Sequence, residues 1–181
     1  MPWPGAARIS SGSCHFLHDP DGHLLTEATS AGATATEYAW LGDTPLAMVA
    51  DADTARPRLF WFHTDHLGTP QKLTDSAGNL AWDAVLEPFG ELASLTVNLV
   101  AQPLRLPGQY ADPETGLHQN WWRDYDPSLG RYLQPDPLGI TAGPNLYGHV
   151  DGNPSPDSTA TAESGTRCLI SASSATTSIA L

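Results

Sequence analysis

Short runs of apolar and aromatic residues alternate with turn-forming residues along most of the chain. Typical runs are Thr36–Leu41, Arg58–His63 and Asn79–Leu86, each bounded by Gly, Pro, Asp or Asn. Runs of this length and composition, separated by turn residues, are typical of strands joined by hairpins. No window shows a convincing helical period with caps, although Glu91–Val100 could form one weak helical turn. The pattern therefore predicts an all-β fold of antiparallel hairpins.

The sequence repeats itself at a spacing of 46 positions, so that Asp19 falls on Asp65 and Gly22 falls on Gly68. In each copy, the Asp carboxylate can accept hydrogen bonds from backbone N–H groups a few residues on, and the Gly supplies the positive φ that closes the turn. Each copy forms about two hairpins, which must pack on neighbouring copies to bury one face. We assign structural turns to three pairs: Asp19 with Gly22, Asp65 with Gly68, and Asp126 with Gly130.

Composition divides the chain into three segments. Residues 1–13 are expected to be irregular, residues 14–154 hold the repeats, and residues 155–181 form a tail rich in Ser, Thr and Ala. The tail contains no aromatic residue, and we expect it to be disordered because it has little apolar area to bury. The chain has 16 Gly and 16 Pro, which disfavour long helices, while 6 Trp and 5 Tyr can build a core.

Charge and cysteine content exclude several classes of function. With 20 acidic and 8 basic residues, the chain carries a formal charge of −12, which disfavours binding to nucleic acid. No stretch approaches the roughly 18 apolar residues of a membrane span, and no secretory signal is visible. Cys14 and Cys168 could form at most one bridge, and their pairing stays open. No cofactor is expected.

Several motifs follow one another in a fixed order. They are Phe62–Pro70, Asp75–Asn79, Arg105–Tyr110, Asp112–Leu117, Arg123–Tyr132 and Pro135–Gly139. In order and spacing they resemble the repeat-associated core of the RHS, or YD-repeat, family over roughly residues 14–154. This resemblance implies a β-ribbon that spirals into a closed shell around a C-terminal toxin, deployed in bacterial competition or in insecticidal toxins.

The resemblance also implies a function. The chain is short, and a tail follows the core where a toxin domain is expected, so the leading expectation is a truncated structural fragment of such a shell without its own toxin domain. One alternative is a carbohydrate- or cell-surface-binding module, and another is a self-cleaving aspartyl core. The partners implied are the upstream part of a shell, a second chain at the sheet edges, or surface glycans. The family implies a secreted or cell-surface location.

The resemblance places self-cleavage at Asp136, as one of two carboxylates, with Arg131 as a neighbouring charge. Aspartyl chemistry needs two acids that share a proton, one acting as base and the other as acid. The second Asp-Pro-x-Gly motif, expected soon after Pro154, is missing, and only Asp151 or Asp157 could take its place. We therefore expect a vestigial site and a chain that does not cleave itself.

Two further groups of residues suggest binding sites. His63, Asp65 and His66 look like a metal cluster, but zinc needs three or four convergent ligands and His66 would point away from the other two. A hairpin turn explains the same residues, so we expect no metal. Trp121 and Trp122 could stack on sugar rings, although aromatic residues on a β-ribbon also pack against the next turn of the sheet.

Overall fold

The computed structural model describes residues 8–9 and 12–149, which form thirteen strands and one short 3₁₀ helix. The strands are β1 (Arg8–Ile9), β2 (Gly12–His18), β3 (Leu24–Thr29), β4 (Thr34–Leu41), β5 (Thr44–Ala50), β6 (Arg58–Thr64), β7 (Pro70–Asp75), β8 (Leu80–Leu86), β9 (Leu92–Asn98), β10 (Gln109–Ala111), β11 (His118–Asn120), β12 (Arg123–Asp126) and β13 (Arg131–Tyr132). The helix η1 covers Gly139–Ala142, and the described residues contain no α-helix. The prediction of an all-β fold is confirmed.

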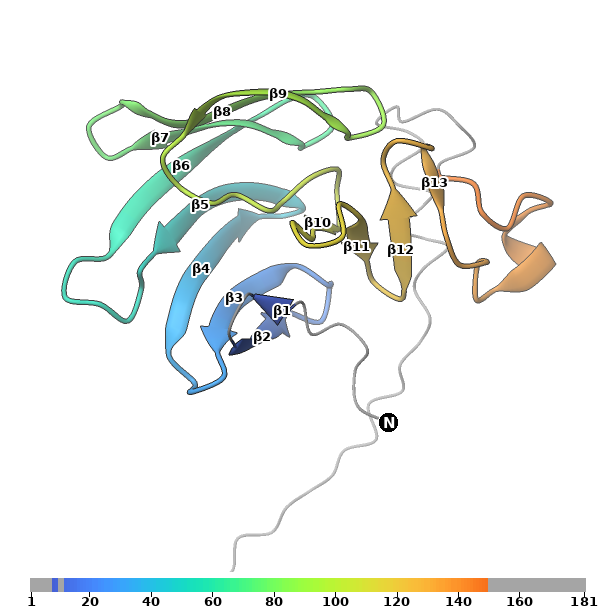
Figure 1. Ribbon diagram of the computed structural model, residues 1–181, viewed down its shortest axis with the longest axis horizontal. Coiled ribbons are helices and arrows are strands. Elements are labelled where there is room, and N and C mark those ends of the chain that lie inside the picture. Colours follow the sequence, from blue (N-terminus) through green and yellow to red (C-terminus); the bar gives the residue numbers. More distant parts are fainter. Residues whose placement is uncertain (1–7, 10–11, 150–181) are drawn as a thin grey trace, which may run out of the picture.

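The first nine strands form one sheet in which each strand pairs with the next, in the order β1 to β9. Every pairing in this sheet is antiparallel, so the chain runs as a continuous meander of hairpins. The sheet curls into an arc, with the first strands at one end and β8 and β9 at the other (Figure 1). Within the described residues, β1 and β9 each pair with one strand only and form the two edges of this sheet.

Five hairpin turns share one local geometry, which explains the repeat in the sequence. In the turn Asp65–Thr69, the N–H of Asp65 donates to the carbonyl of Thr69 (3.0 Å), and the N–H of Gly68 donates back to the carbonyl of Asp65 (3.2 Å). Gly68 has a φ of 85°, which an L side chain rarely adopts. This is a three-residue loop with a left-handed glycine, a common hairpin connection. The other four turns are Asp19–His23, Thr29–Ala33, Asp75–Asn79 and Glu87–Glu91.

The core lies on one face of the long sheet. Side chains alternate between the two faces of a strand, so in β6 Phe60 is buried while Leu59 and Trp61 are exposed. The buried row continues across the sheet through Tyr38, Met48, Leu73 and Trp82. The segment after β9 covers this face and adds Val100 and Leu104 to the same cluster.

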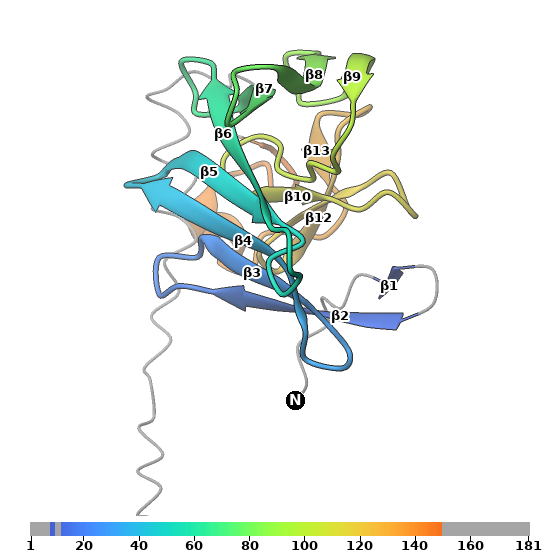
Figure 2. The same cartoon turned by 90° about the vertical axis from the view of Figure 1, so that its left-hand side faces the viewer.

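A small antiparallel sheet of β10 to β13 fills the open side of the arc (Figures 1 and 2). Its central residue, Tyr125, is fully buried, and its hydroxyl donates to the carbonyl of Phe89 in the β8–β9 turn (2.9 Å). The opposite end of the small sheet meets the β2–β3 turn, where the Trp121 ring packs against Gly22. The two sheets therefore contact each other at both ends of the arc.

Two expectations from the sequence are wrong in the structure. Glu91–Val100 forms no helical turn, because its residues Leu92–Asn98 pair with β8 as strand β9. Within the segment expected to be irregular, Arg8–Ile9 and Gly12–Ser13 belong to paired strands. The tail, Cys168 and the possible Cys14–Cys168 bridge lie outside the described residues. Within residues 8–9 and 12–149, no helix has the length and apolar character needed to cross a membrane.

Candidate functional site

Asp136 is held in a buried ion pair just after the last strand. Its Oδ2 lies 3.0 Å from Nη1 of Arg123, and the two side chains are only 16% and 11% exposed. Its Oδ1 accepts a hydrogen bond from the backbone N–H of Leu138 (2.9 Å). Arg131, which the resemblance suggests as the neighbouring charge, instead lies over the ring of Tyr147 (5.1 Å). The cation that pairs with Asp136 is therefore Arg123.

Aromatic residues fix Arg123 in this position. Its guanidinium lies 3.6 Å from the centre of the Tyr132 ring, a close cation–π contact. The Tyr132 hydroxyl accepts a hydrogen bond from Nδ2 of Asn120 (2.8 Å) and lies 3.3 Å from Nδ1 of His149. Burial, together with the charge of Arg123, lowers the pKa of His149 to about 4, so this ring is neutral at physiological pH. Sequence reasoning missed Arg123, because both Arg123 and Arg131 belong to the same motif and only the fold shows which of them reaches Asp136.

The geometry around Asp136 does not supply a pair of acids. Both of its oxygens have partners, one the guanidinium of Arg123 and the other a backbone amide. Among the described residues no second carboxylate is hydrogen-bonded to it. Asp151 and Asp157, the two acids considered as substitutes, lie outside the described residues. The visible part of the site can hold a fixed negative charge but lacks an acid to protonate a leaving amide.

We expect the purified chain to remain a single species near its full 19.3 kDa between about pH 5 and pH 8. The reason is that the described site holds a single carboxylate, with both oxygens already bonded, and no second acid to give a proton to the leaving nitrogen. Intact-mass spectrometry after prolonged incubation tests this expectation. A break C-terminal to Asn153 that disappears in Asp136→Asn would show that a second acid completes the site.

A second buried carboxylate lies between the two sheets. Glu27, on the inner face of β3, is only 8% exposed. The Tyr38 hydroxyl donates to its Oε1 (2.5 Å), and the Tyr110 hydroxyl, from the small sheet, donates to its Oε2 (3.4 Å). Burial raises the pKa of Glu27, and the two hydrogen bonds only partly offset this. The signal in the sequence is an acidic residue inside an apolar strand, which requires partners from elsewhere in the fold.

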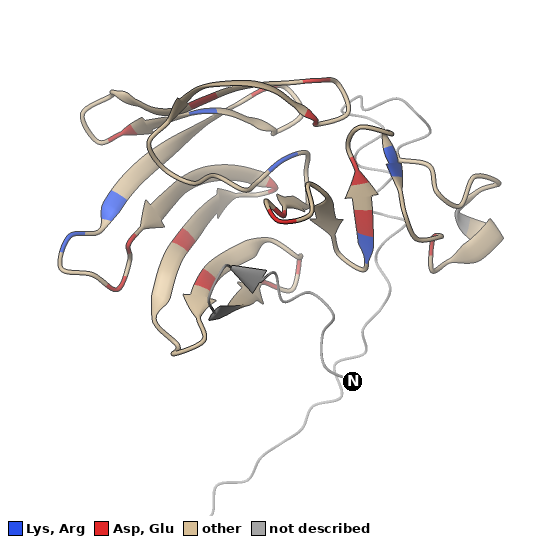
Figure 3. Ribbon diagram, in the orientation of Figure 1, with Lys and Arg blue, Asp and Glu red and all other residues tan. Residues whose placement is uncertain are grey.

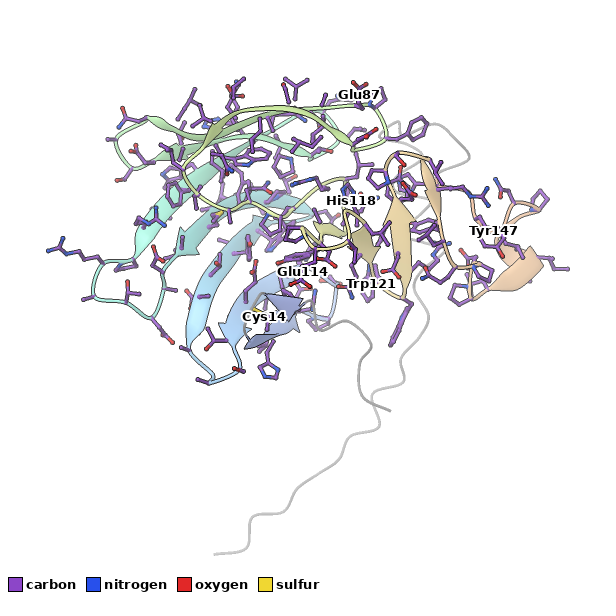
Figure 4. All side chains as sticks on the ribbon, viewed as in Figure 1. Cys14, Glu87, Glu114, His118, Trp121 and Tyr147 are labelled. Atoms are coloured by element: carbon purple, nitrogen blue, oxygen red, sulfur yellow. The ribbon has the colours of Figure 1, made fainter. Side chains whose placement is uncertain are left out.

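Trp121 and Trp122 occupy different environments. The Trp121 ring packs so closely on Gly22 that a methyl group at Gly22 would lie 1.9 Å from Cζ2 of the ring. Figure 4 shows Trp121 at the side of the small sheet that faces the first hairpins. Trp122 is 47% exposed. The close packing of Trp121 leaves the face of its ring that covers Gly22 unavailable to a sugar.

The structure places the remaining Asp and Gly candidates in turns, whereas His63 lies in strand β6. Oδ1 of Asp65 accepts hydrogen bonds from the backbone N–H groups of Leu67 (2.9 Å) and Thr69 (3.0 Å), as the turn interpretation requires. His63 lies 2.9 Å from the Thr74 hydroxyl. Among the described residues, no group of three or more His, Cys, Asp or Glu is arranged to hold a metal ion. Asp126 caps its turn through Ser128 (2.9 Å), and Gly22, Gly68 and Gly130 all have positive φ.

The sequence is similar to those of known proteins. The family described as "RHS protein" matches residues 59–95. "Double-stranded DNA deaminase toxin A" of Burkholderia cenocepacia is 38% identical over 150 residues, which cover 72% of this chain and 10% of that protein. "Toxin protein Tse5" of Pseudomonas aeruginosa is 46% identical over 93 residues, which cover 51% of this chain and 7% of that protein. The chain thus spans a tenth or less of the length of these two relatives.

The fold also has solved counterparts. A crystal structure of TcdB2-TccC3-TEV superimposes with a TM-score of 0.58 at 23% identity, over 83% of this chain and 8% of that one. The Tc holotoxin pore of Photorhabdus luminescens matches with a TM-score of 0.53 at 20% identity, over 82% of this chain and 9% of that one. At these identities the match shows the fold alone. The fold and its repeated turns define an all-β repeat protein, and segments of these Tc toxin structures have the same fold. The chain belongs to the RHS family.

Proposed function

We propose that this chain is a structural wall segment of an RHS-type shell that encloses a toxin in bacterial competition. Support comes from relatives whose names describe toxins and from the likeness of the fold to segments of Tc toxin assemblies. Both relatives are much longer than the chain, as a shell wall requires.

One observation carries this proposal: the nine-stranded meander ends in a free strand. All seven residues of β9 are exposed or half-buried, and β9 pairs with β8 on one side only. A free strand edge presents unpaired N–H and C=O groups, which pair readily with a further strand. Strand β9 contains no acidic residue, and the acidic residues lie on other strands and turns (Figure 3). In a shell, a strand from outside residues 8–149 would cover β9, because the next strand along this chain, β10, belongs to the small sheet.

We expect the isolated chain to self-associate, because its strand edges and exposed apolar residues have no shell to cover them. Replacing Leu95, on β9, with lysine should shift the population toward the monomer, since a charged side chain on an edge strand disfavours pairing with another chain. Light scattering coupled to size-exclusion chromatography measures this shift. We expect the apparent association constant to fall by about tenfold or more, a change of roughly 1.4 kcal/mol.

The matched control is Leu129→Lys, which makes the same chemical change in the β12–β13 turn. Leu129 is 64% exposed and lies outside the long sheet, so this variant should associate as the parent chain does. A monomeric parent chain, or an equal response of the two variants, would contradict the assignment of β9 as an open edge. Retained far-ultraviolet circular dichroism in both variants shows that the strands are intact.

A further inference from the structure

The imidazole of His23 joins the tips of two hairpins, β2–β3 and β4–β5, at the same end of the long sheet. His23 ends the β2–β3 turn, and its Nδ1 lies 2.8 Å from Oδ2 of Asp19 in the same turn. Its Nε2 lies 3.0 Å from Oδ1 of Asp43. Asp43 belongs to the next turn at this end of the sheet, between β4 and β5. One ring therefore bridges two carboxylates that belong to separate hairpins.

The surrounding residues fix the ring in this bridging position. The imidazole stacks on the indole of Trp40, with ring centres 4.7 Å apart and an angle of 30° between the planes. The indole is itself fixed, because its Nε1 donates to the carbonyl of Leu24 (2.9 Å). The backbone N–H of His23 donates to the second oxygen of Asp19 (2.8 Å). The His23 side chain is only 16% exposed, whereas that of Asp43 is 74% exposed.

This bridge requires a charged ring. A carboxylate only accepts hydrogen bonds, and only the imidazolium form of histidine has a proton on both nitrogens. The other titratable groups nearby are His18, at the end of β2, and Asp21, in the same turn. Burial of the ring lowers the pKa of His23, but the hydrogen bonds and charges of Asp19 and Asp43 outweigh burial and raise it above 6.5.

We propose that His23 is a proton-dependent clasp that closes the β4–β5 tip onto the β2–β3 tip when the ring is charged and releases it when the ring is neutral. Loss of the ring proton leaves a lone pair facing one carboxylate. Asp43 is the partner that separates, because Asp19 is also held by the backbone N–H of His23. The same turn supports Trp121 through Gly22, so the clasp acts where the small sheet meets the long sheet.

The pH range follows from the signs of the two pKa shifts. A histidine whose pKa is raised by folding contributes its full stabilisation below its unfolded pKa of about 6.5 and loses it as the pH rises through the folded value. The hydrogen bonds and charge of His23 lower the pKa of Asp19, although burial opposes this. Asp19 therefore stays ionised at pH values below the usual pKa of an aspartate. The clasp is therefore fully closed below about pH 6.5, while Asp19 is ionised, and it opens as the pH rises through the raised pKa of the folded ring.

The second copy of the repeat provides an internal control. The position equivalent to His23 is Thr69, 46 residues further on. There the Asp65 carboxylate accepts hydrogen bonds from two backbone amides and from Nε2 of Gln71 (3.2 Å), none of which titrates near neutral pH. The turn Asp65–Thr69 has the same backbone geometry as Asp19–His23 but lacks the proton-dependent contact.

Hydrogen exchange of the full chain, measured by mass spectrometry at about pH 5.5 and pH 8.5 and corrected for the intrinsic rate, tests the clasp. We expect the protection factors of residues 41–44 to fall by about two- to fivefold at the higher pH. This is the size of effect expected when a partly exposed ion pair is lost. The control turn at residues 65–69 should not change. His23→Gln, which keeps a polar side chain but does not titrate, should remove the pH dependence at residues 41–44.

A nuclear magnetic resonance titration of the His23 ring in Asp43→Asn provides a second readout. Its pKa should fall relative to the parent chain, because one of the two carboxylates has lost its charge. The clasp is refuted if the ring titrates identically in the two proteins, or if both turns lose protection equally with pH. The comparison of the two turns uses only the parent chain, so it decides the question even if a variant fails to fold.

Discussion

Gly22→Ala is expected to lower the free energy of unfolding by about 2–5 kcal/mol, a large effect for a single methyl group. Two causes combine at this position. Gly22 has a φ of 94°, which strains any residue with a side chain. The new methyl group would also lie 1.9 Å from Cζ2 of Trp121, so the indole would have to leave its place between the two sheets. Urea denaturation followed by tryptophan fluorescence measures the loss.

Gly68→Ala provides the matched control, because Gly68 is the equivalent residue in the second copy of the repeat. Its φ of 85° imposes a similar strain, but no atom lies within 4 Å of the position that the methyl group would take. This variant should lose only about 1–2 kcal/mol. The difference between the losses of unfolding free energy in the two variants measures the cost of displacing Trp121. Equal losses would mean that the indole does not pack on the turn, and Trp121→Ala should then leave the cost of Gly22→Ala unchanged.

Local chemistry explains why much of the ribbon can be predicted from the sequence. An Asp and a Gly three positions apart, as in Asp65 and Gly68, form their turn through contacts within five residues. The apolar and aromatic run Arg58–His63, bounded by turn residues, likewise identifies a single strand, which the structure shows as β6. These features need no knowledge of the rest of the fold, which is why the meander of hairpins was predictable.

The contacts that build the candidate sites are not local. Tyr110 and Glu27 are 83 positions apart in the sequence and meet only because the small sheet fills the arc of the large one. The pairing of Asp136 with Arg123 rather than Arg131 depends on which side of the small sheet each guanidinium reaches. Strand β9 was mistaken for a helical turn for the same reason, because its β character comes from pairing with β8.

Tyr38→Phe is expected to lower the free energy of unfolding by about 1.5–3 kcal/mol at neutral pH. The change removes only the hydroxyl, which makes a 2.5 Å hydrogen bond to Oε1 of the buried Glu27. Glu27 would then remain in the core with one oxygen unsatisfied. Because burial already raises the pKa of Glu27, loss of this donor should raise it further. Denaturation curves at several pH values measure both effects.

The direction in which the effect of Tyr38→Phe changes with pH follows from the linkage between folding and the protonation of Glu27. A carboxyl group whose pKa is raised in the folded state destabilises the fold increasingly as the pH rises from its unfolded value of about 4.3 through the folded value. The penalty of Tyr38→Phe should therefore be smaller near pH 4, where Glu27 is protonated, than near pH 8. Tyr110→Phe is the control, because its hydroxyl lies 3.4 Å from the other oxygen of Glu27, and this longer bond should contribute under about 1 kcal/mol. A larger loss for Tyr110→Phe than for Tyr38→Phe would mean that the bond to the small sheet, rather than the bond within the long sheet, satisfies the buried carboxylate.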